Sequence, residues 1–122
     1  MNYKKINIAF LLFGLLFCFS SNAFALGVKQ FVEVCNSSQA GHQQFCNTYL
    51  GGALDAIAVL NDKAKKEKQA PIYCKHEKEI FNAPKIIAYV SSLKAKWHDK
   101  NAILPVIDYL SAVGGCDASK NK

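Results

Sequence analysis

The cysteines place the tightest limit on what this chain can fold into. Four of its five cysteines lie in the last 97 of 122 residues, at positions 35, 46, 74 and 116. A domain of that size buries only a little over about 60% of its unfolded surface, which supports a modest core. An even number of cysteines in a small exported domain is typical of disulfides that compensate for such a core. A disulfide framework therefore requires evidence of export.

The first 25 residues have the three parts of a secretory signal peptide. Two lysines supply a positive start, an apolar run covers residues 6–19, and Ala23-Phe24-Ala25 forms an A-x-A cleavage site. A membrane anchor would need roughly 20 apolar residues, more than this run provides. We therefore expect cleavage after Ala25, loss of Cys18 with the leader, no membrane association afterwards, and a periplasmic domain over 26–122.

Composition and residue spacing argue against a nucleic-acid partner and against a metal. The 97 residues after the leader hold 13 lysines against 9 acidic residues, a net charge of +4, and the chain has no arginine. The lysines over 61–68 are interpreted as the solvated end of a helix, where the dipole favours cations. Nucleic-acid binding is disfavoured, because arginine and interleaved aromatic residues are missing. The spacing in Cys74-Lys75-His76 does not fit a zinc-binding pair, so we expect neither a metal nor another cofactor.

Four segments have the apolar spacing of an amphipathic helix, with apolar residues at intervals of three and four. We expect helices over 28–35, from about 42 to about 66, over 82–93 and from about 101 to 113. No segment has the strict alternation of a strand, so the sequence predicts an all-α domain, a compact bundle of four main helices stapled by two disulfides. The apolar stripes comprise Val28, Phe31, Val32 and Cys35; Cys46, Tyr49, Leu50, Ala53, Ala56, Ile57 and Leu60; Ala83, Ile86, Ile87, Val90 and Leu93; and Ile103, Val106, Ile107, Leu110 and Val113.

Residues with strong capping preferences mark the ends of the last two helices. Asn82 is placed to cap the third helix, with Pro84 in its first turn. Asp99 or Asn101 is placed to cap the fourth helix. Gly114-Gly115 follows the last apolar position and is typical of a helix C-terminus.

A glycine pair, Gly51-Gly52, lies inside the second expected helix. Each glycine costs roughly 1 kcal/mol there relative to Ala. Such a cost suggests that another backbone packs closely against the helix at this point. For Gly51, an exposed position that merely weakens the helix is an equally good interpretation.

The expected helix order selects a disulfide pairing. Short loops make consecutive helices antiparallel neighbours, so Cys35 at the end of the first helix meets Cys46 near the start of the second. Cys74 precedes the third helix and Cys116 follows the fourth, and these ends also meet in an antiparallel hairpin. The sequence therefore predicts Cys35–Cys46 and Cys74–Cys116. The two other pairings remain as alternatives that join ends less clearly adjacent.

No catalytic constellation stands out. With its cysteines oxidised, the domain has no thiolate nucleophile, and none of its serines lies in a G-x-S-x-G turn. Glu77 and Glu79 are interpreted as the solvated start of a helix. The three histidines, His42, His76 and His98, lie in polar segments that favour exposure. We expect a protein that binds another protein and is not an enzyme.

The segment 46–56 has the form C-x-x-Y-L-x-G-x-x-D-A. Together with the cysteines around it, this segment resembles the Rap/Tai family, the periplasmic immunity proteins of type VI secretion amidase effectors. The resemblance implies a helical domain over 26–122 that binds a secreted peptidoglycan amidase and blocks its active site. We interpret the motif as a signature of the fold, with Tyr49 and Gly52 packing a helix interface and Asp55 bonding to another loop. The motif residues are Cys46, Tyr49, Gly52 and Asp55.

The sequence-based hypothesis is thus an immunity protein of the periplasm that inhibits a type VI amidase effector. The alternative is a small helical chaperone of the acid-stress type, or a general protein-binding module. Such a chaperone needs apolar surface that becomes exposed in acid. A homodimer is compatible with either function.

Two surfaces are candidates for partner contact. Trp97, the only tryptophan, lies with His98 in a polar turn, where a large aromatic on a rigid connection can anchor an interface. The other interpretation, which we favour, is that Trp97 extends the stripe of Leu93 and covers the end of the core. The second surface is the loop 36–41, held by the expected Cys35–Cys46 disulfide.

Overall fold

The protein is described here by a computed structural model, which covers residues 25–116. The expected signal peptide, including Cys18, lies outside the described residues, except for its last residue, Ala25. No strand occurs between residues 25 and 116, so the all-α prediction is confirmed. The elements are α2 (Val28–Cys35), α3 (Ala40–Lys66), α4 (Glu77–Ile80), α5 (Ala83–Ser91), the 3-10 turn η1 (Ala95–Trp97) and α6 (Ile103–Val113).

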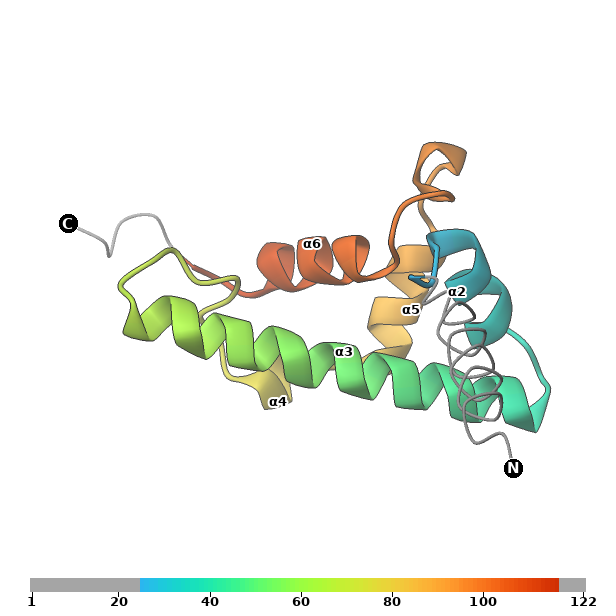
Figure 1. Cartoon of the computed structure of the whole chain (residues 1–122), viewed down its shortest axis with the longest axis horizontal. Helices are drawn as coiled ribbons and strands as arrows, with labels where there is room; N and C mark the ends of the chain where they lie inside the picture. The colour runs from blue at the N-terminus through green and yellow to red at the C-terminus, as the bar shows by residue number, and fades with distance from the viewer. Residues whose placement is uncertain (1–24, 117–122) are drawn as a thin grey trace, which may run out of the picture.

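Helix α3 is the longest helix between residues 25 and 116, and the other helices are arranged around it (Figure 1). Its 27 residues make it about 40 Å long at 1.5 Å per residue. Figure 1 shows α2 and α5 gathered over its N-terminal half, α6 running above it, and the short α4 beneath it. Helix α2 packs on both α3 and α5, and α5 packs on α6. Over the described range, no helix is both long and apolar enough to cross a membrane.

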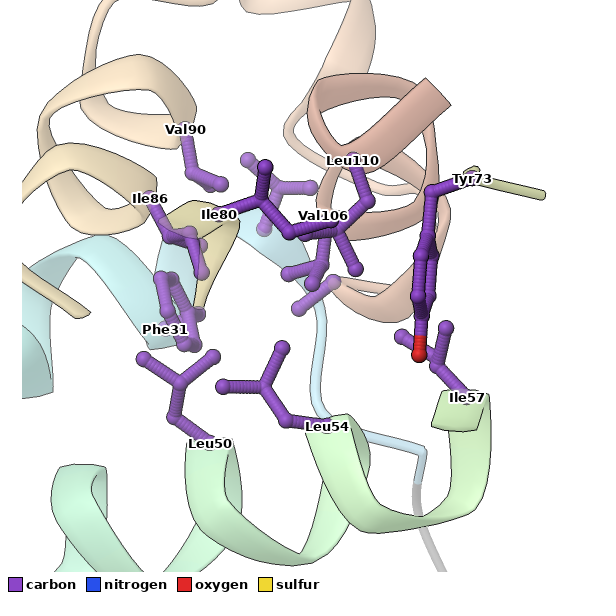
Figure 2. Close-up of a cluster of buried hydrophobic side chains, with 12 residues drawn as sticks. Phe31, Leu50, Leu54, Ile57, Tyr73, Ile80, Ile86, Val90, Val106 and Leu110 are labelled. Atoms are coloured by element: carbon purple, nitrogen blue, oxygen red, sulfur yellow. The ribbon is translucent and has the colours of Figure 1, made fainter. Parts of the chain in front are cut away.

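The core fills the space between α3 and the shorter helices (Figure 2). Phe31 of α2 and the apolar face of α3 contact side chains from α4, α5 and α6. The expected stripes of α2, α5 and α6 supply half of these buried residues. The core consists of Val28, Phe31, Leu50, Leu54, Ile57, Tyr73, Ile80, Ile86, Val90, Ala102, Val106 and Leu110.

The apolar stripe predicted for α3 is wrong at two positions. Ala56 and Leu60 are exposed, whereas Leu54 and Asn61 are buried. The buried face follows the helical spacing from Cys46, and this spacing reaches Asn61 rather than its apolar neighbour Leu60. Position on the helix therefore overrides the hydrophobicity of the single residue.

Asn61 lies on the buried face of α3 and forms a hydrogen bond to the segment that follows this helix. Its Oδ1 accepts a hydrogen bond from the backbone N–H of Tyr73 at 3.0 Å, while its Nδ2 has no hydrogen-bond partner. The Tyr73 side chain enters the core beside Ile57 (Figure 2), and its hydroxyl donates to Glu77 Oε1 at 2.8 Å. This segment, absent from the predicted core, thus contributes one of its largest buried side chains.

The expected close packing at Gly51-Gly52 is also wrong. Both glycines are exposed, and a Cβ atom added at either would meet nothing within 4 Å. Close packing occurs instead at Gly114, where an added Cβ would lie 2.9 Å from the Cα of Tyr73. Gly114 therefore allows α6 to end directly against the Tyr73 backbone.

The helix ends agree with most of the capping predictions. The Asn82 side chain accepts a hydrogen bond from Lys85 N–H at 3.0 Å at the start of α5. At the start of α6 the N-cap residue is Ala102, which provides no side-chain cap, so neither Asp99 nor Asn101 occupies the N-cap position. Asn101, one residue earlier, still accepts a hydrogen bond from Ile103 N–H through its Oδ1 at 3.0 Å. After α6, Gly115 adopts a φ of +61°, the left-handed conformation that favours glycine at a helix C-terminus.

Candidate functional site

Both predicted disulfides are present. Cys35 and Cys46 bridge the end of α2 and the second turn of α3, with their Cα atoms 5.2 Å apart. Cys74 and Cys116 join the segment before α4 to the residue beyond Gly115, with Cα atoms 4.9 Å apart. Cys46 is buried, whereas Cys74 and Cys116 are exposed. The two disulfides therefore differ in their exposure to solvent.

The loop between α2 and α3, residues 36–39, is held by more than its disulfide. Asn36 Nδ2 donates to Val32 O and to Ser91 Oγ, each at 2.9 Å, which ties the loop to α5. Ser37 Oγ accepts from Gln39 N–H at 3.2 Å and shares a hydrogen bond of 2.8 Å with His42 Nδ1. We call residues 36–39 the stapled loop.

The stapled loop presents polar groups to solvent. Ser38 and Gln39 are both exposed, and Gln39 occupies the N-cap position of α3 without using its side chain as a cap. Because Cys35–Cys46 and the hydrogen bonds of Ser37 fix the backbone on either side, these two side chains project from a rigid support. The sequence predicts a contact surface at 36–41, but α3 begins at Ala40, so the loop is shorter than expected.

The motif residues all lie on α3, but they do not form one site. Cys46 is buried in its disulfide, and Tyr49 is partly buried, with its ring centroid 5.9 Å from that of Phe31. This burial raises the pKa of the Tyr49 hydroxyl above its ordinary value. Gly52 and Asp55 are exposed. The expected packing role thus holds for Tyr49 and is wrong for Gly52.

Trp97 and His98 lie on a different part of the molecule. Figure 1 shows the connection that carries η1 standing at the top of the view, while α3 lies at the bottom. The Trp97 ring is partly buried and packs against the core. The backbone oxygen of His98 accepts a hydrogen bond from Lys29 N–H at 3.2 Å, and the exposed His98 side chain borders a hollow of about 310 Å³ shared with Lys29 and Asp99.

Residues that sequence reasoning missed supply the rigidity of the stapled loop. Asn36, Ser37 and His42 make the bonds that brace it. Ser and Asn commonly bond to nearby backbone groups in turns, so the Asn36-Ser37-Ser38 run carried a usable signal. The hydrogen bond from Asn36 to Ser91, which lies 55 residues away, has no such signal in the local sequence. Within residues 25–116, no three His, Cys, Asp or Glu side chains cluster as a metal site would require.

Comparison with known proteins gives no match: no protein-family model, no curated protein and no solved structure matches this chain.

Proposed function

We propose that this protein is a periplasmic immunity protein that binds and inhibits a secreted peptidoglycan amidase effector of type VI secretion. The observation that carries the proposal is the stapled loop, a short polar segment fixed by a disulfide and by hydrogen bonds from both of its ends. An inhibitor of this kind needs a projection that enters an enzyme cleft. The resemblance of the motif at 46–56 to the Rap/Tai family supplies the class of partner.

The bracing of the stapled loop supports tight binding. A loop that orders only on binding loses about 0.5–1.5 kcal/mol for each immobilised side chain, in addition to its backbone entropy. Here the Cys35–Cys46 disulfide and the Asn36 and Ser37 hydrogen bonds have already restricted the loop. Binding therefore requires no further ordering of the stapled loop and avoids that loss of free energy. This rigidity favours an inhibitor over a protein that must adapt to many clients.

The proposal predicts a secreted amidase gene beside this one, and the direct test is capture and inhibition of that amidase. The mature chain, beginning at Leu26, is mixed with that amidase, and both affinity and hydrolysis of purified peptidoglycan are measured. We expect a stable complex and loss of hydrolysis. If the amidase neither binds the chain nor loses activity in its presence, the proposal fails.

Two variants locate the contact. Gln39→Arg changes an exposed side chain of the stapled loop, and Gln69→Arg makes the same change in the loop after α3, where Gln69 is also exposed. If the stapled loop enters the cleft, Gln39→Arg weakens binding at least 10-fold and Gln69→Arg leaves it unchanged. Equal affinities for both variants and the original chain would remove the loop from the interface.

The acid-stress chaperone has one observation in its favour. Three large apolar side chains of α3, Phe45, Val59 and Leu60, are exposed. A chaperone would suppress the aggregation of an unrelated periplasmic protein at low pH, which light scattering measures. Suppression at low pH without affinity for the amidase would select this function over the immunity protein.

A further inference from the structure

The connection between α5 and α6 that carries η1 concentrates positive charge. Lys94, Lys96 and Lys100 are exposed there, and Asp99 is the only acidic residue among them. The start of α2 adds Lys29, which is also exposed and whose backbone N–H donates a hydrogen bond to this connection. Four lysines and one carboxylate are therefore gathered in one region. We call the four lysines the basic end.

The basic end is held on a fixed support. Backbone hydrogen bonds join residues 26–29 to residues 98–102, among them Val28 N–H to Lys100 O at 2.9 Å and Ala102 N–H to Leu26 O at 2.8 Å. Figure 1 shows this connection standing above the helices, with the start of α2 beside it. Two segments that lie far apart in the sequence thus fix the backbone from which the exposed lysines extend.

Two helix dipoles add to this charge. Helices α2 and α6 both begin beside the connection, at Val28 and Ile103, and neither has an acidic residue in its first turn. The N-terminus of a helix carries a partial positive charge. The dipoles and the lysines therefore act in the same direction at the basic end.

The lysines at the C-terminal end of α3 are in a different situation. There Lys63 Nζ lies 3.8 Å from Glu67 Oε1, the one ion pair between residues 25 and 116. Lys65 Nζ lies 5.5 Å from the centroid of the Tyr73 ring. The C-terminus of α3 also contributes a partial negative charge. We therefore expect the positive potential of the surface to be concentrated at the basic end.

The chemistry of the basic end selects the kind of anion. Trp97 is the one aromatic ring of the connection, and it is partly buried against the core, so stacking on bases or sugars is not available. Lysine ammonium groups act as separate point charges, in contrast to the bidentate fork of arginine. A membrane surface usually requires a second, apolar signal for stable binding, and the nearest exposed large apolar residue along the chain is the single Leu104. These properties favour an anionic polymer with separate carboxylates.

We propose that the basic end binds peptidoglycan through the free carboxylates of its peptide stems. Because the polymer repeats these carboxylates, several weak contacts can form at once and reinforce one another. The inference goes beyond inhibition of the amidase and shares with the proposed function only the periplasmic location. A chain bound in this way would be concentrated on the polymer that the amidase hydrolyses.

Cosedimentation of the mature chain with insoluble purified peptidoglycan tests the proposal. The original chain should pellet with the polymer in about 20 mM salt and bind at least tenfold more weakly in about 300 mM salt, where charges are screened within a few ångströms. The triple variant Lys94→Gln, Lys96→Gln and Lys100→Gln should bind at least tenfold more weakly than the original chain in the low-salt buffer.

A second triple variant is the matched control. Lys65→Gln, Lys66→Gln and Lys68→Gln also remove three exposed lysines and lower the net charge equally, but they lie at the C-terminal end of α3. This variant should lose less than threefold in affinity. Equal losses in the two triple variants would overturn the proposal, because binding would then depend on net charge alone. Circular dichroism melting verifies that both variants are folded.

Three further results decide whether the ligand is the carboxylate polymer. Peptidoglycan whose carboxylates have been converted to amides should no longer bind the chain, and undiminished binding would overturn the proposal. Equal affinity for vesicles of anionic lipid would also overturn it, in favour of a membrane surface. A chain that stays in the supernatant at low salt would overturn it outright. Affinity for the amidase, measured in solution without polymer, is a separate result, so a chain that binds the amidase but does not pellet rejects this inference and retains the proposed function.

Discussion

Gly114 is the residue at which a single methyl group should do the most damage. An added Cβ there would lie 2.9 Å from Tyr73 Cα, backbone that cannot move without shifting the Cys74 segment. We expect Gly114→Ala to lower the free energy of unfolding by about 1–3 kcal/mol, the range for overpacking. Gly51→Ala should instead raise it by about 0.5–1 kcal/mol, because Ala is the better helix former and space is open. Urea denaturation at 5 µM measures both, and equal effects would contradict this account.

Tyr73 should make the fold sensitive to alkali. Its burial, followed by its hydrogen bond to the Glu77 carboxylate, raises the pKa of its hydroxyl well above the ordinary value. The unfolded chain releases this proton near pH 10, whereas the folded chain retains it. The folded state therefore binds more protons above pH 10, and stability falls as pH rises from there. Below pH 10 this contribution is fully present.

The alkaline loss of stability can be assigned by substitution. Tyr73→Phe removes the titrating group, so its free energy of unfolding should fall less between pH 9 and pH 11 than that of the original chain. Tyr109→Phe, at a partly buried tyrosine of α6, serves as the control for the loss of a hydroxyl. Chemical denaturation at both pH values is the measurement. Parallel pH dependence in Tyr73→Phe and the original chain would remove Tyr73 as the cause.

Single residues were predictable from sequence where their role depends on near neighbours. The side chains of Asn82, the N-cap of α5, and of Asn101 bond to backbone N–H groups two or three positions away, so a local pattern contains them. Tyr73 and Gly114 depend on each other across the fold. Asn61 is buried because a polar acceptor is needed for the Tyr73 N–H. No periodicity indicates such a need, so the polar part of the core could not be predicted.

At the scale of elements, predictability follows length. The four main helices are long enough to repeat their apolar spacing at least twice, and each was found within a few residues of its bounds. Helix α4, with 4 residues, and η1, with 3, span about one turn each, so no apolar spacing repeats within them. The pairing of the cysteines was also predictable, because short loops constrain which helix ends can meet.

The two disulfides should differ in their resistance to reduction. Cys74 and Cys116 are exposed, whereas Cys46 is buried, and exposed disulfides are the more readily reduced. At increasing concentrations of a mild reductant we expect Cys74–Cys116 to open first. Alkylation followed by peptide mass spectrometry measures the order. Opening of Cys35–Cys46 at the same or a lower concentration would contradict it.

Each disulfide should also contribute to stability. Loss of a native disulfide from a small secreted domain typically costs about 2–5 kcal/mol. Cys74–Cys116 closes 42 residues and Cys35–Cys46 closes 11, and the longer loop gains more in the entropy model. We therefore expect Cys74→Ala with Cys116→Ala to lower the melting temperature at least as much as Cys35→Ala with Cys46→Ala. Thermal melts followed by circular dichroism compare the two pairs, and a clearly smaller effect at Cys74–Cys116 would contradict the entropy argument.

At the scale of the whole molecule, the sequence indicated the architecture but not the surfaces. The stripes and the cysteine pairing determine which helices are neighbours. They do not determine that the stapled loop bonds to Ser91 or that Phe45, Val59 and Leu60 of α3 are exposed. Those properties depend on which side of each helix the packing leaves free. For the same reason, Trp97 had two interpretations from sequence, and only its packing against the core distinguishes them.

The Trp97 side chain should therefore contribute to stability before it contributes to binding. It is partly buried on η1 and contacts the core cluster, so Trp97→Ala should cost about 2–3 kcal/mol, somewhat less than for a fully buried tryptophan. His98→Ala, at the exposed neighbour, should leave the melting temperature unchanged. If this connection also anchors the amidase, Trp97→Phe, which keeps a packed ring, will weaken the complex while remaining folded. A Trp97→Ala variant with unchanged stability would show that the ring does not support the core. If Trp97→Phe and His98→Ala both leave the affinity for the amidase unchanged, this connection is excluded as the anchor and the stapled loop is favoured.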